Sequence, residues 1–356
     1  MSRFWSPIIN QLAPYVPGEQ PKNDRSLIKL NTNENPYPPS DKVIDAIRST
    51  AELGLQKYPD PNGQHLKNAI ADYHQLDEKQ VFVGNSSDEV LAHVFLGLFS
   101  GKTNPLCFPD ITYGFYPVYC KLYDINYQTI PLADDFSLDL SLYPKQNSGI
   151  IFANPNAPSS LALDLSSIKQ CLENNPDSVV VVDEAYVDFG TDSAIALIDQ
   201  FPNLLITQTL SKSRSLAGLR VGFACGQPEL IDALERVKNS FNAYPLDQLA
   251  LAGACASFAD EAYFQEKRQQ VIATREQTVT SLAELGFEVL QSKANFVFAK
   301  PPKPATAEQV FTALREKNII VRYFEKPRIE EYLRITIGTD EEMAMLCRAL
   351  SEILDL

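Results

Sequence analysis

Short, continuous apolar runs separated by amphipathic stretches are the feature of this 356-residue chain that most limits its possible folds. Residues 81–83, 149–153, 179–182 and 204–207 are apolar without the alternation of a half-exposed strand. Strands that are apolar on both faces are typical of parallel sheets covered by helices on both sides. Helical patterns, such as residues 165–172, lie between these runs. The chain therefore predicts an α/β fold with a mostly parallel sheet.

A different pattern begins near residue 250. Residues 261–283 have the pattern of one long helix, and shorter elements follow it. The expected strands cover 287–290, 295–299, 319–322 and 332–337, and the expected helices cover 306–317 and 340–354. The last of these helices opens with Thr339-Asp-Glu-Glu342, which is typical of a capping box. We therefore predict a second, smaller α+β domain at the C-terminal end.

The first 39 residues are rich in proline and asparagine, which favour irregular chain. A loose surface tail is one interpretation of this segment. Tyr15, Ile28 and Leu30 give it apolar anchors, however, so we favour an arm that packs over the rest of the protein. The prediction is an N-terminal arm at 1–39, a large domain at 40–250 and a small C-terminal domain at 251–356.

Composition excludes several classes of function. The net charge of −14 argues against a nucleic-acid or anionic-membrane partner, because either needs a basic surface. No apolar run approaches the length that spans a bilayer, and the first residues lack the apolar stretch of a signal peptide, so we expect a cytoplasmic protein. The six scattered cysteines suggest buried free thiols, and the three histidines form no convincing metal site. Demanding chemistry would then require an organic cofactor.

Polar residues follow the ends of the predicted strands. Ser86 comes after the first run, Asn154 after the second, Asp183 after the four valines, and Lys212 shortly after the fourth run. Open α/β sheets bind ligands at the carboxyl ends of their strands. One pocket can therefore collect all of these side chains.

Lys212 and Asp183 are the two residues with the strongest chemical meaning. A lysine in a dry pocket or beside a cation has its pKa lowered from roughly 10.4, which leaves a nucleophilic amine. A carboxylate directly after a buried strand is costly unless it is paired, and a protonated pyridine nitrogen is a suitable partner. The alternative is that Asp183 caps a turn or pairs with a buried arginine.

Three further residues could contact a cofactor ring. Tyr186 and Asn154 are placed to reach a phenolic oxygen, and Tyr113 could lie against the ring face. The segment from Asn154 to Pro158 is also consistent with a simple turn. Tyr113 is equally consistent with a place in the core.

A phosphate cradle is expected at the start of the helix that begins at Ser86. Exposed N–H groups and the positive end of the helix dipole favour an anion there, although serine is also an ordinary N-cap residue. Arg220 would neutralise a phosphate through paired donors. No glycine-rich nucleotide loop is present, which disfavours nucleotide cofactors. The expected cradle consists of Ser86, Ser87, Asp88, Thr209, Ser211 and Arg220.

An amine, a ring-nitrogen acid, phenolic-oxygen donors and a phosphate cradle are together what pyridoxal 5'-phosphate requires. The order and spacing of Ser211-Lys212-x₇-Arg220, Asp183-x-x-Tyr186 and Asn154-Pro-Asn resemble the class II aminotransferases, which are fold-type I pyridoxal-phosphate enzymes. Within that family the chain is similar to the histidinol-phosphate aminotransferases. The segments that carry this similarity are Pro14-Tyr-Val-Pro-Gly18, residues 29–36, Tyr58-Pro-Asp60 and residues 333–339.

The resemblance implies roles for individual residues. Lys212 would bind the cofactor covalently and act as general base, with Asp183 on the ring nitrogen. Asn154 and Tyr186 would contact the phenolic oxygen, and Tyr113 would stack on the ring. The catalytic set is therefore Lys212, Asp183 and Tyr186, and the cradle residues would hold the cofactor phosphate.

The same resemblance implies a homodimer in which Tyr58 reaches the cofactor phosphate of the neighbouring subunit. Arg334 would hold the anionic group of the substrate. The other expected substrate-binding residues are Tyr15, Asn35, Tyr244 and Arg322. One departure is visible, because the family often has glycine where this chain has Ser160, and this change should alter the turn after Asn154.

The implied activity is transamination between histidinol phosphate and 2-oxoglutarate, giving imidazole acetol phosphate and glutamate, in histidine biosynthesis. An aromatic amino-acid aminotransferase, or a decarboxylase of a phosphorylated amino acid, is the alternative on the same fold, because Arg334 serves a carboxylate as readily as a phosphate. A non-catalytic ligand-sensing module is a second alternative. It would be marked by a basic helix-turn-helix extension, whereas this chain is acidic.

Overall fold

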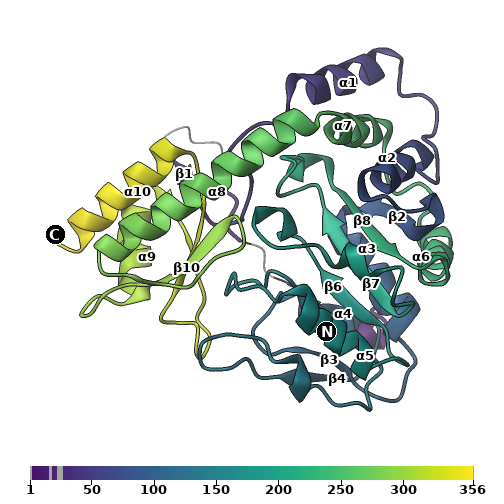
Figure 1. The fold of residues 1–356 in the computed structure, drawn as a ribbon, viewed down its shortest axis with the longest axis horizontal. Helices are drawn as coiled ribbons and strands as arrows, with labels where there is room; N and C mark the ends of the chain where they lie inside the picture. Colours follow the sequence, from purple (N-terminus) through teal and green to yellow (C-terminus); the bar gives the residue numbers. More distant parts are fainter. Residues whose placement is uncertain (1, 16–17, 22–26, 356) are drawn as a thin grey trace.

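The computed structural model describes residues 2–15, 18–21 and 27–355. These residues form two units, each with its own sheet (Figure 1). Residues 16 and 17 of the expected N-terminal motif, and residues 22–26 of the expected arm, lie outside the described residues. The division at 39/40 and 250/251 stays a prediction.

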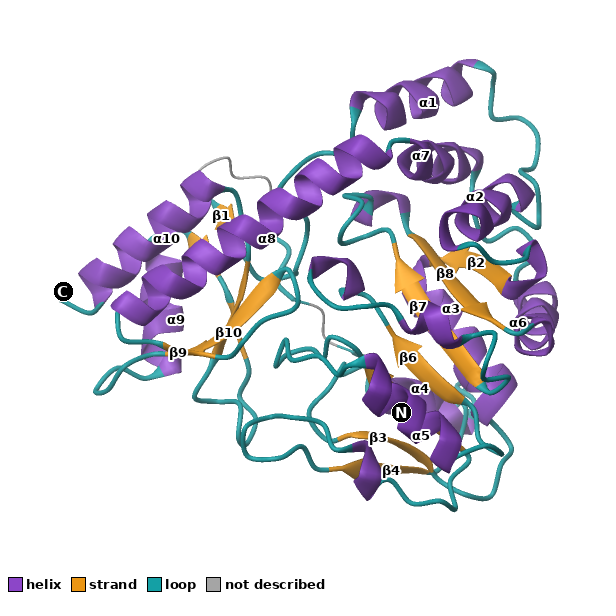
Figure 2. Ribbon diagram, viewed as in Figure 1, coloured by secondary structure: helices purple, strands orange, loops and turns teal. Residues whose placement is uncertain are grey.

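The larger sheet has seven strands in the order β2-β8-β7-β6-β5-β3-β4 (Figure 2). Its strands are β2 (Val81–Asn85), β3 (Leu106–Pro109), β4 (Tyr127–Ile130), β5 (Gly149–Ala153), β6 (Val180–Asp183), β7 (Leu204–Thr209) and β8 (Val221–Gly226). β8 runs antiparallel to both β2 and β7, and the other neighbouring pairs are parallel. The prediction of a mostly parallel sheet is confirmed.

The continuous apolar runs are explained by burial on both faces of this sheet. Along β6, Val180 and Val182 join one core cluster while Val181 joins another, and β2, β5 and β7 alternate in the same way. Helices cover both faces, so neither set of side chains reaches water. The helices of this unit are α1 (Asp41–Glu52), α2 (Gln64–His74), α3 (Ser86–Val94), α4 (Tyr116–Leu122), α5 (Leu165–Asn174), α6 (Pro228–Phe241) and α7 (Gln248–Ala259).

The second unit contains an antiparallel sheet in the order β12-β13-β10-β9. Its strands are β9 (Glu288–Val289), β10 (Phe296–Lys300), β12 (Arg322–Tyr323) and β13 (Leu333–Thr336). Its helices are α8 (Glu261–Glu284), α9 (Ala307–Glu316) and α10 (Asp340–Ile353). The expected capping box of the last helix is present between Thr339 and Glu342. The smaller α+β unit is thus confirmed.

The N-terminal segment joins the second unit. β1 (Ile28–Lys29) pairs in parallel with β11 (Ile319–Ile320), and Ile28 and Leu30 are buried in the same core cluster as β10 and β13. The prediction of a single strand at 319–322 was wrong, because β11 and β12 are separate strands that pair with different partners. Tyr15 remains 39% exposed, so only two of the three expected anchors are buried.

The structure bears on three expectations from composition, which concern the cysteines, membrane spans and metal sites. All six cysteines are free, but Cys255 and Cys347 are only partly buried, so the expectation that every thiol is buried was wrong. Among the described residues, no helix combines the length and apolar character that crossing a membrane requires. Over the same residues, no group of three or more histidine, cysteine, aspartate or glutamate side chains could hold a metal ion.

Candidate active site

Two adjoining cavities lie at the carboxyl ends of the strands of the larger sheet. The smaller is about 150 Å³ and the larger about 730 Å³. Four residues line both cavities, and these are Tyr113, Ala157, Tyr186 and Lys212. The smaller cavity is also lined by Ser86, Ser87, Asp88, Asp183, Thr209, Ser211 and Arg220. The structure therefore brings together most of the side chains that the strand ends predicted.

Lys212 lies in the loop after β7 and carries its amine to the boundary of the two cavities. Its Nζ donates to the carbonyl of Thr32 over 3.0 Å and lies 5.9 Å from the centre of the Tyr186 ring. Burial and, to a lesser extent, the nearby charge of Arg334 together lower the pKa of Lys212 to about 8. A lysine with this pKa supplies a neutral amine at near-neutral pH far more readily than an exposed lysine.

Asp183 ends β6 and faces the smaller cavity. Its two oxygens accept hydrogen bonds from the hydroxyls of Tyr116 at 2.9 Å and Thr207 at 3.3 Å. Burial raises the pKa of Asp183 to about 6, which these two bonds partly oppose. The partners are neutral, so this carboxyl has no buried-arginine partner among them and can still stabilise a cation in the cavity.

Tyr186 is held by residues from the N-terminal segment and from the second sheet. Its hydroxyl oxygen accepts a hydrogen bond from Nδ2 of Asn33 over 3.0 Å. The Oδ1 atom of Asn33 in turn accepts from the hydroxyl of Thr336 at 3.0 Å. Because the Tyr186 oxygen accepts from Asn33 rather than donating to it, the O–H of Tyr186 can still donate toward the cavity.

The phosphate cradle is formed where α3 begins beside β8. Ser86 is the first residue of α3 and has φ of 72°, and its hydroxyl accepts a hydrogen bond from the backbone nitrogen of Asp88 at 3.3 Å, as an N-cap serine does. A Cβ atom added to Gly222 would lie 2.3 Å from the backbone nitrogen of Ser87. Only glycine therefore permits this approach of β8 to the start of the helix.

Charged side chains complete this cradle. Arg220 donates to the hydroxyl of Ser86 at 2.8 Å and to the carboxylate of Asp88 at 2.7 Å. The other oxygen of Asp88 accepts from the hydroxyl of Tyr113 at 2.9 Å. Asp88 thus fixes both an arginine and an aromatic ring at the wall of the cavity.

Asn154 is not among the residues that line either cavity. Its side-chain amide donates to the carbonyl of Leu163 at 3.3 Å and accepts from the Leu163 nitrogen at 2.8 Å. Its contact with a phenolic oxygen stays a prediction. Ser160 has φ of 64°, the region that glycine favours, so the chain keeps a left-handed residue at this turn despite the substitution.

Three arginines line the larger cavity, and one of them, Arg328, pairs with Asp110. The guanidinium groups of the other two, Arg322 and Arg334, lie 5.2 and 5.5 Å from the centre of the Phe324 ring. Arg334 donates to the carbonyl of Asn31 at 2.8 Å, and its Nε is buried without a partner in the described residues. Burial lowers the pKa of Arg334. Such a pair of cations fits a carboxylate or a phosphate, and Tyr15 lines the same cavity.

Like Asn154, three more expected site residues lie outside the linings of the two cavities. Tyr58 is 81% exposed and stacks on Tyr244 at 4.7 Å between ring centres, and neither lines the two cavities. Asn35 donates from Nδ2 to the carbonyls of Lys212 at 3.0 Å and Ser213 at 3.1 Å. Asn35 therefore holds the backbone of the lysine loop, and its contact with substrate stays a prediction.

Sequence reasoning missed four residues that shape the site, namely Thr32, Asn33, Tyr116 and Gly222. Asn33 belongs to the asparagine-rich segment at 29–36, whose density of amide side chains was the available signal. Gly222 follows Arg220 by two residues, and a glycine in a strand often marks a close backbone approach. Tyr116 gave no signal, because its reach to Asp183 depends on how α4 packs.

The structure offers a test of whether pyridoxal phosphate fits these residues. Ser86, Ser87 and Arg220 line the smaller cavity together with Asp183 and Lys212. The hydroxyl partners of the Asp183 carboxyl are neutral, and the Lys212 amine is buried. Anion donors, an acid and an amine thus surround one cavity. The residues present fit a phosphorylated pyridine carbonyl cofactor.

Comparisons with known proteins agree with this geometry. Residues 25–350 match the model of the family "Aminotransferase class I and II". Histidinol-phosphate aminotransferase 1 of Hydrogenovibrio crunogenus is 57% identical over 99% of both chains, and that of Pseudomonas aeruginosa is 58% identical over 98% of this chain and 99% of its own.

Solved structures show the same fold. Histidinol-phosphate aminotransferase from Sinorhizobium meliloti, in complex with pyridoxal-5'-phosphate, superposes with a TM-score of 0.88 at 24% identity and covers 100% of this chain and 98% of its own. L-threonine-O-3-phosphate decarboxylase from Porphyromonas gingivalis superposes with a TM-score of 0.78 at 21% identity, covering 93% of this chain and 100% of its own. The chain belongs to the class I and II aminotransferase family, and within it to the histidinol-phosphate aminotransferases.

Proposed function

We propose that this protein is a pyridoxal-phosphate-dependent aminotransferase that interconverts histidinol phosphate and 2-oxoglutarate with imidazole acetol phosphate and glutamate, a step of histidine biosynthesis. One observation carries the proposal. The Lys212 amine lies at the boundary between a cavity whose lining includes Ser86, Arg220 and Asp183 and a larger cavity whose lining includes Arg322 and Arg334. The names of the relatives at 57–58% identity support the choice of substrate.

Bound in the smaller cavity, the cofactor would supply an electron-withdrawing ring that stabilises negative charge at the reacting carbon. Ser86, Arg220 and the backbone of Ser87 would hold its phosphate, and Asp183 would hold its ring nitrogen. The burial that raises the Asp183 pKa also strengthens attraction to a cationic ring nitrogen. Tyr186, with its lone pair engaged by Asn33, would donate its proton toward the phenolic oxygen.

Lys212 would carry the proton at the reacting carbon. Its amine needs a neutral fraction to accept this proton, and a pKa of about 8 supplies one near neutral pH. Arg334 and Arg322 would orient the substrate by its phosphate, or by the distal carboxylate of glutamate. The same two cations serve both substrates in turn, which a two-stage amino transfer requires.

We also infer a homodimer in which Tyr58 reaches the neighbouring cofactor site. Leu53, Leu55 and Tyr58 are exposed between α1 and α2, and Phe241 is exposed at the end of α6. Large exposed apolar side chains mark association surfaces. Mixing a Tyr58→Ala protein with a Lys212→Ala protein should restore activity in hybrid dimers. Unchanged activity of Tyr58→Ala alone would contradict the shared site.

A cytoplasmic location is part of the proposal. The six cysteines are free, and free thiols persist in a reducing compartment. Fractionation of a cell that expresses the protein, followed by immunoblotting of each fraction, tests this location. Recovery in a membrane or secreted fraction would contradict it.

The function is tested by single-turnover absorbance titration of the cofactor-loaded protein. Histidinol phosphate and glutamate should each convert the visible band of the lysine-bound cofactor to that of its amino form. Conversion by phenylalanine and tyrosine alone would instead make the protein an aromatic aminotransferase. Release of carbon dioxide from a phosphorylated amino acid would indicate decarboxylation. Absence of any cofactor band after loading would exclude the cofactor itself.

A further inference from the structure

Arg214 is a buried cation two residues after Lys212 that the proposed reaction does not use. Its side chain is 5% exposed. Its guanidinium carbon lies 4.0 Å from the centres of both the Phe258 and the Phe264 rings, and 4.9 Å from that of Tyr73. Three aromatic rings therefore surround one positive charge, and cation–π attraction is at its strongest where water is excluded.

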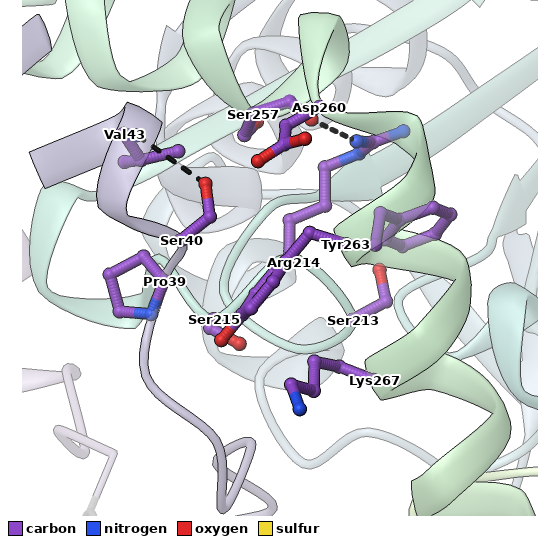
Figure 3. Close-up of a pocket in the computed structure, with 11 residues that line it drawn as sticks. Pro39, Ser40, Val43, Ser213, Arg214, Ser215, Ser257, Asp260, Tyr263 and Lys267 are labelled. Carbon is purple, nitrogen blue, oxygen red and sulfur yellow. Dashed lines mark hydrogen bonds between the residues drawn. The ribbon is translucent and has the colours of Figure 1, made fainter.

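Polar contacts of Arg214 reach the junction between α7 and α8. Nη1 donates to the carbonyl of Ser257 over 2.7 Å, close to the end of α7 (Figure 3). Nη2 lies 3.9 Å from the carboxylate of Glu261, the first residue of α8. Burial lowers the pKa of Arg214, and the negative charges of Asp188 and Glu261 oppose that shift. The arginine thus connects the lysine loop to the start of the long helix that leads to the second sheet (Figure 1).

The lysine loop is held from its other side as well. Asn35 donates to the carbonyls of Lys212 and Ser213, and the hydroxyl of Ser213 donates to Asp188. The cavity behind the loop is only about 20 Å³ and is lined by Arg214, Ser213 and residues of α7 and α8. On this side of the loop, opposite the two large cavities that Lys212 lines, there is little free space into which the backbone could move while Arg214 is in place.

We propose that Arg214 is a positioning residue that fixes the backbone of Lys212 against the junction of α7 and α8. The inference rests on the proposed function, which makes Lys212 the reactive amine. Arg214 touches no part of either cavity that would hold cofactor or substrate. Arg214 acts through the loop. Its removal would take away the cation that three aromatic rings surround and the hydrogen-bond donor of the Ser257 carbonyl, and it would leave a void next to the lysine loop.

The test compares Arg214→Met with Arg214→Lys. Methionine keeps part of the apolar volume and removes the charge and the donors, whereas lysine keeps a cation among the rings. The matched control is Arg275→Met, since Arg275 is another buried arginine, on α8, that donates to the carbonyls of Phe189 at 2.7 Å and Ala294 at 2.9 Å. Thermal unfolding of each cofactor-free protein establishes that it is folded.

The first measurement is acetylation of Lys212 in the cofactor-free protein as a function of pH, followed by peptide mass spectrometry. Arg214→Met should move the labelling midpoint upward, toward that of an ordinary lysine, because a loosened loop lets water reach the amine. Arg214→Lys should lie between this variant and the wild type, and Arg275→Met should match the wild type. A folded Arg214→Met protein with the wild-type midpoint would overturn the proposal.

The second measurement is the steady-state rate with cofactor. Displacement of a reacting group costs about 10- to 100-fold in rate, so kcat of Arg214→Met should fall by that factor with KM nearly unchanged. If Arg214→Met does not fold, Arg214→Gln, which keeps a donor for Ser257, replaces it in both measurements. The labelling result does not depend on transamination. A shifted midpoint in an enzyme inactive on histidinol phosphate would therefore overturn the proposed function alone.

Discussion

Asn33 donates a hydrogen bond to the hydroxyl oxygen of Tyr186, and the same asparagine is held by Thr336, two residues beyond Arg334 on β13. The asparagine that contacts the Tyr186 hydroxyl is thus tied to the strand that carries Arg334, the arginine proposed to bind the anionic group of the substrate. We expect Asn33→Ala to lower kcat with histidinol phosphate about fivefold, the equivalent of one hydrogen bond of about 1 kcal/mol. Steady-state kinetics measure this loss.

Asn33→Ala also places an alanine in the left-handed backbone region, so its control must introduce the same strain at a distant site. Asn33 has φ of 56°, and Asn318 has φ of 60° far from Tyr186. Asn318→Ala should therefore lose similar stability while keeping the wild-type kcat. Equal losses of kcat in the two variants would show that strain, rather than the hydrogen bond, controls the rate.

Replacement of Asp183 by asparagine should stabilise the cofactor-free protein at neutral pH. The folded-state pKa is raised from 3.8 to about 6, so the folded protein binds the proton more tightly than the unfolded chain does. The stability linked to that proton is complete below about pH 4 and is lost as the pH rises through about 6. A shift of this size corresponds to about 3 kcal/mol as an upper limit.

Urea unfolding of both cofactor-free proteins at graded pH measures that difference. Asp183→Asn should be the more stable at pH 7, with the gap closing toward pH 4, while the loaded variant loses activity. Tyr116→Phe, which removes a donor from the same carboxyl, should change stability in the opposite direction. A constant gap across the pH range would contradict the assigned pKa.

Gly222→Ala should weaken cofactor binding. The added Cβ would lie 2.3 Å from the Ser87 nitrogen and 2.5 Å from the Ser86 carbonyl carbon, so the cradle must open. Overpacking of this kind costs about 1–3 kcal/mol, which is about 5- to 150-fold in affinity if the strain falls on the cradle. Fluorescence titration with pyridoxal phosphate measures it. Gly218→Ala is the matched control, because a Cβ there meets nothing within 4 Å.

Lys212→Ala should abolish turnover while cofactor remains bound without a covalent bond. The buried amine has no substitute among the residues that line both cavities, which are otherwise two aromatic side chains and an alanine. Borohydride reduction followed by mass spectrometry should show the cofactor attached to the wild type and absent from the variant. Lys300→Ala, which removes a surface partner of Glu331, is the control. A near-normal rate in Lys212→Ala would refute the assignment.

Sequence predicted four strands of the larger sheet and missed three, which are β3, β4 and β8. β2, β5, β6 and β7 bury both faces and therefore stand out as apolar runs. β4 lies at the edge of the sheet and exposes three of its four residues, so it carries no such run. β8 was missed because its two glycines, Gly222 and Gly226, interrupt the apolar pattern.

Some residues of the candidate site could be predicted from the sequence and others could not. Residues at strand ends, such as Asp183 and Lys212, could be predicted because the topology of a parallel sheet brings strand ends together. Tyr116 could not, because its contact with Asp183 depends on how α4 packs. For Asn33 the asparagine-rich segment was a signal, but it did not indicate which of its amides contacts Tyr186. The roles assigned to Asn154, Tyr58 and Tyr244 stay predictions.

The pairing of β1 with β11 places Ile28 beside Ile319. The ribosome makes the first strand of this pair early and the second only when most of the chain has been synthesised. Closing so long a loop carries an entropic cost that contacts in the second core must offset. The larger sheet, whose strands lie between residues 81 and 226, can form beforehand. Because of this order of synthesis, the strands around the smaller cavity can assemble first. The part of the larger cavity that contains Arg322 and Arg334 is completed last.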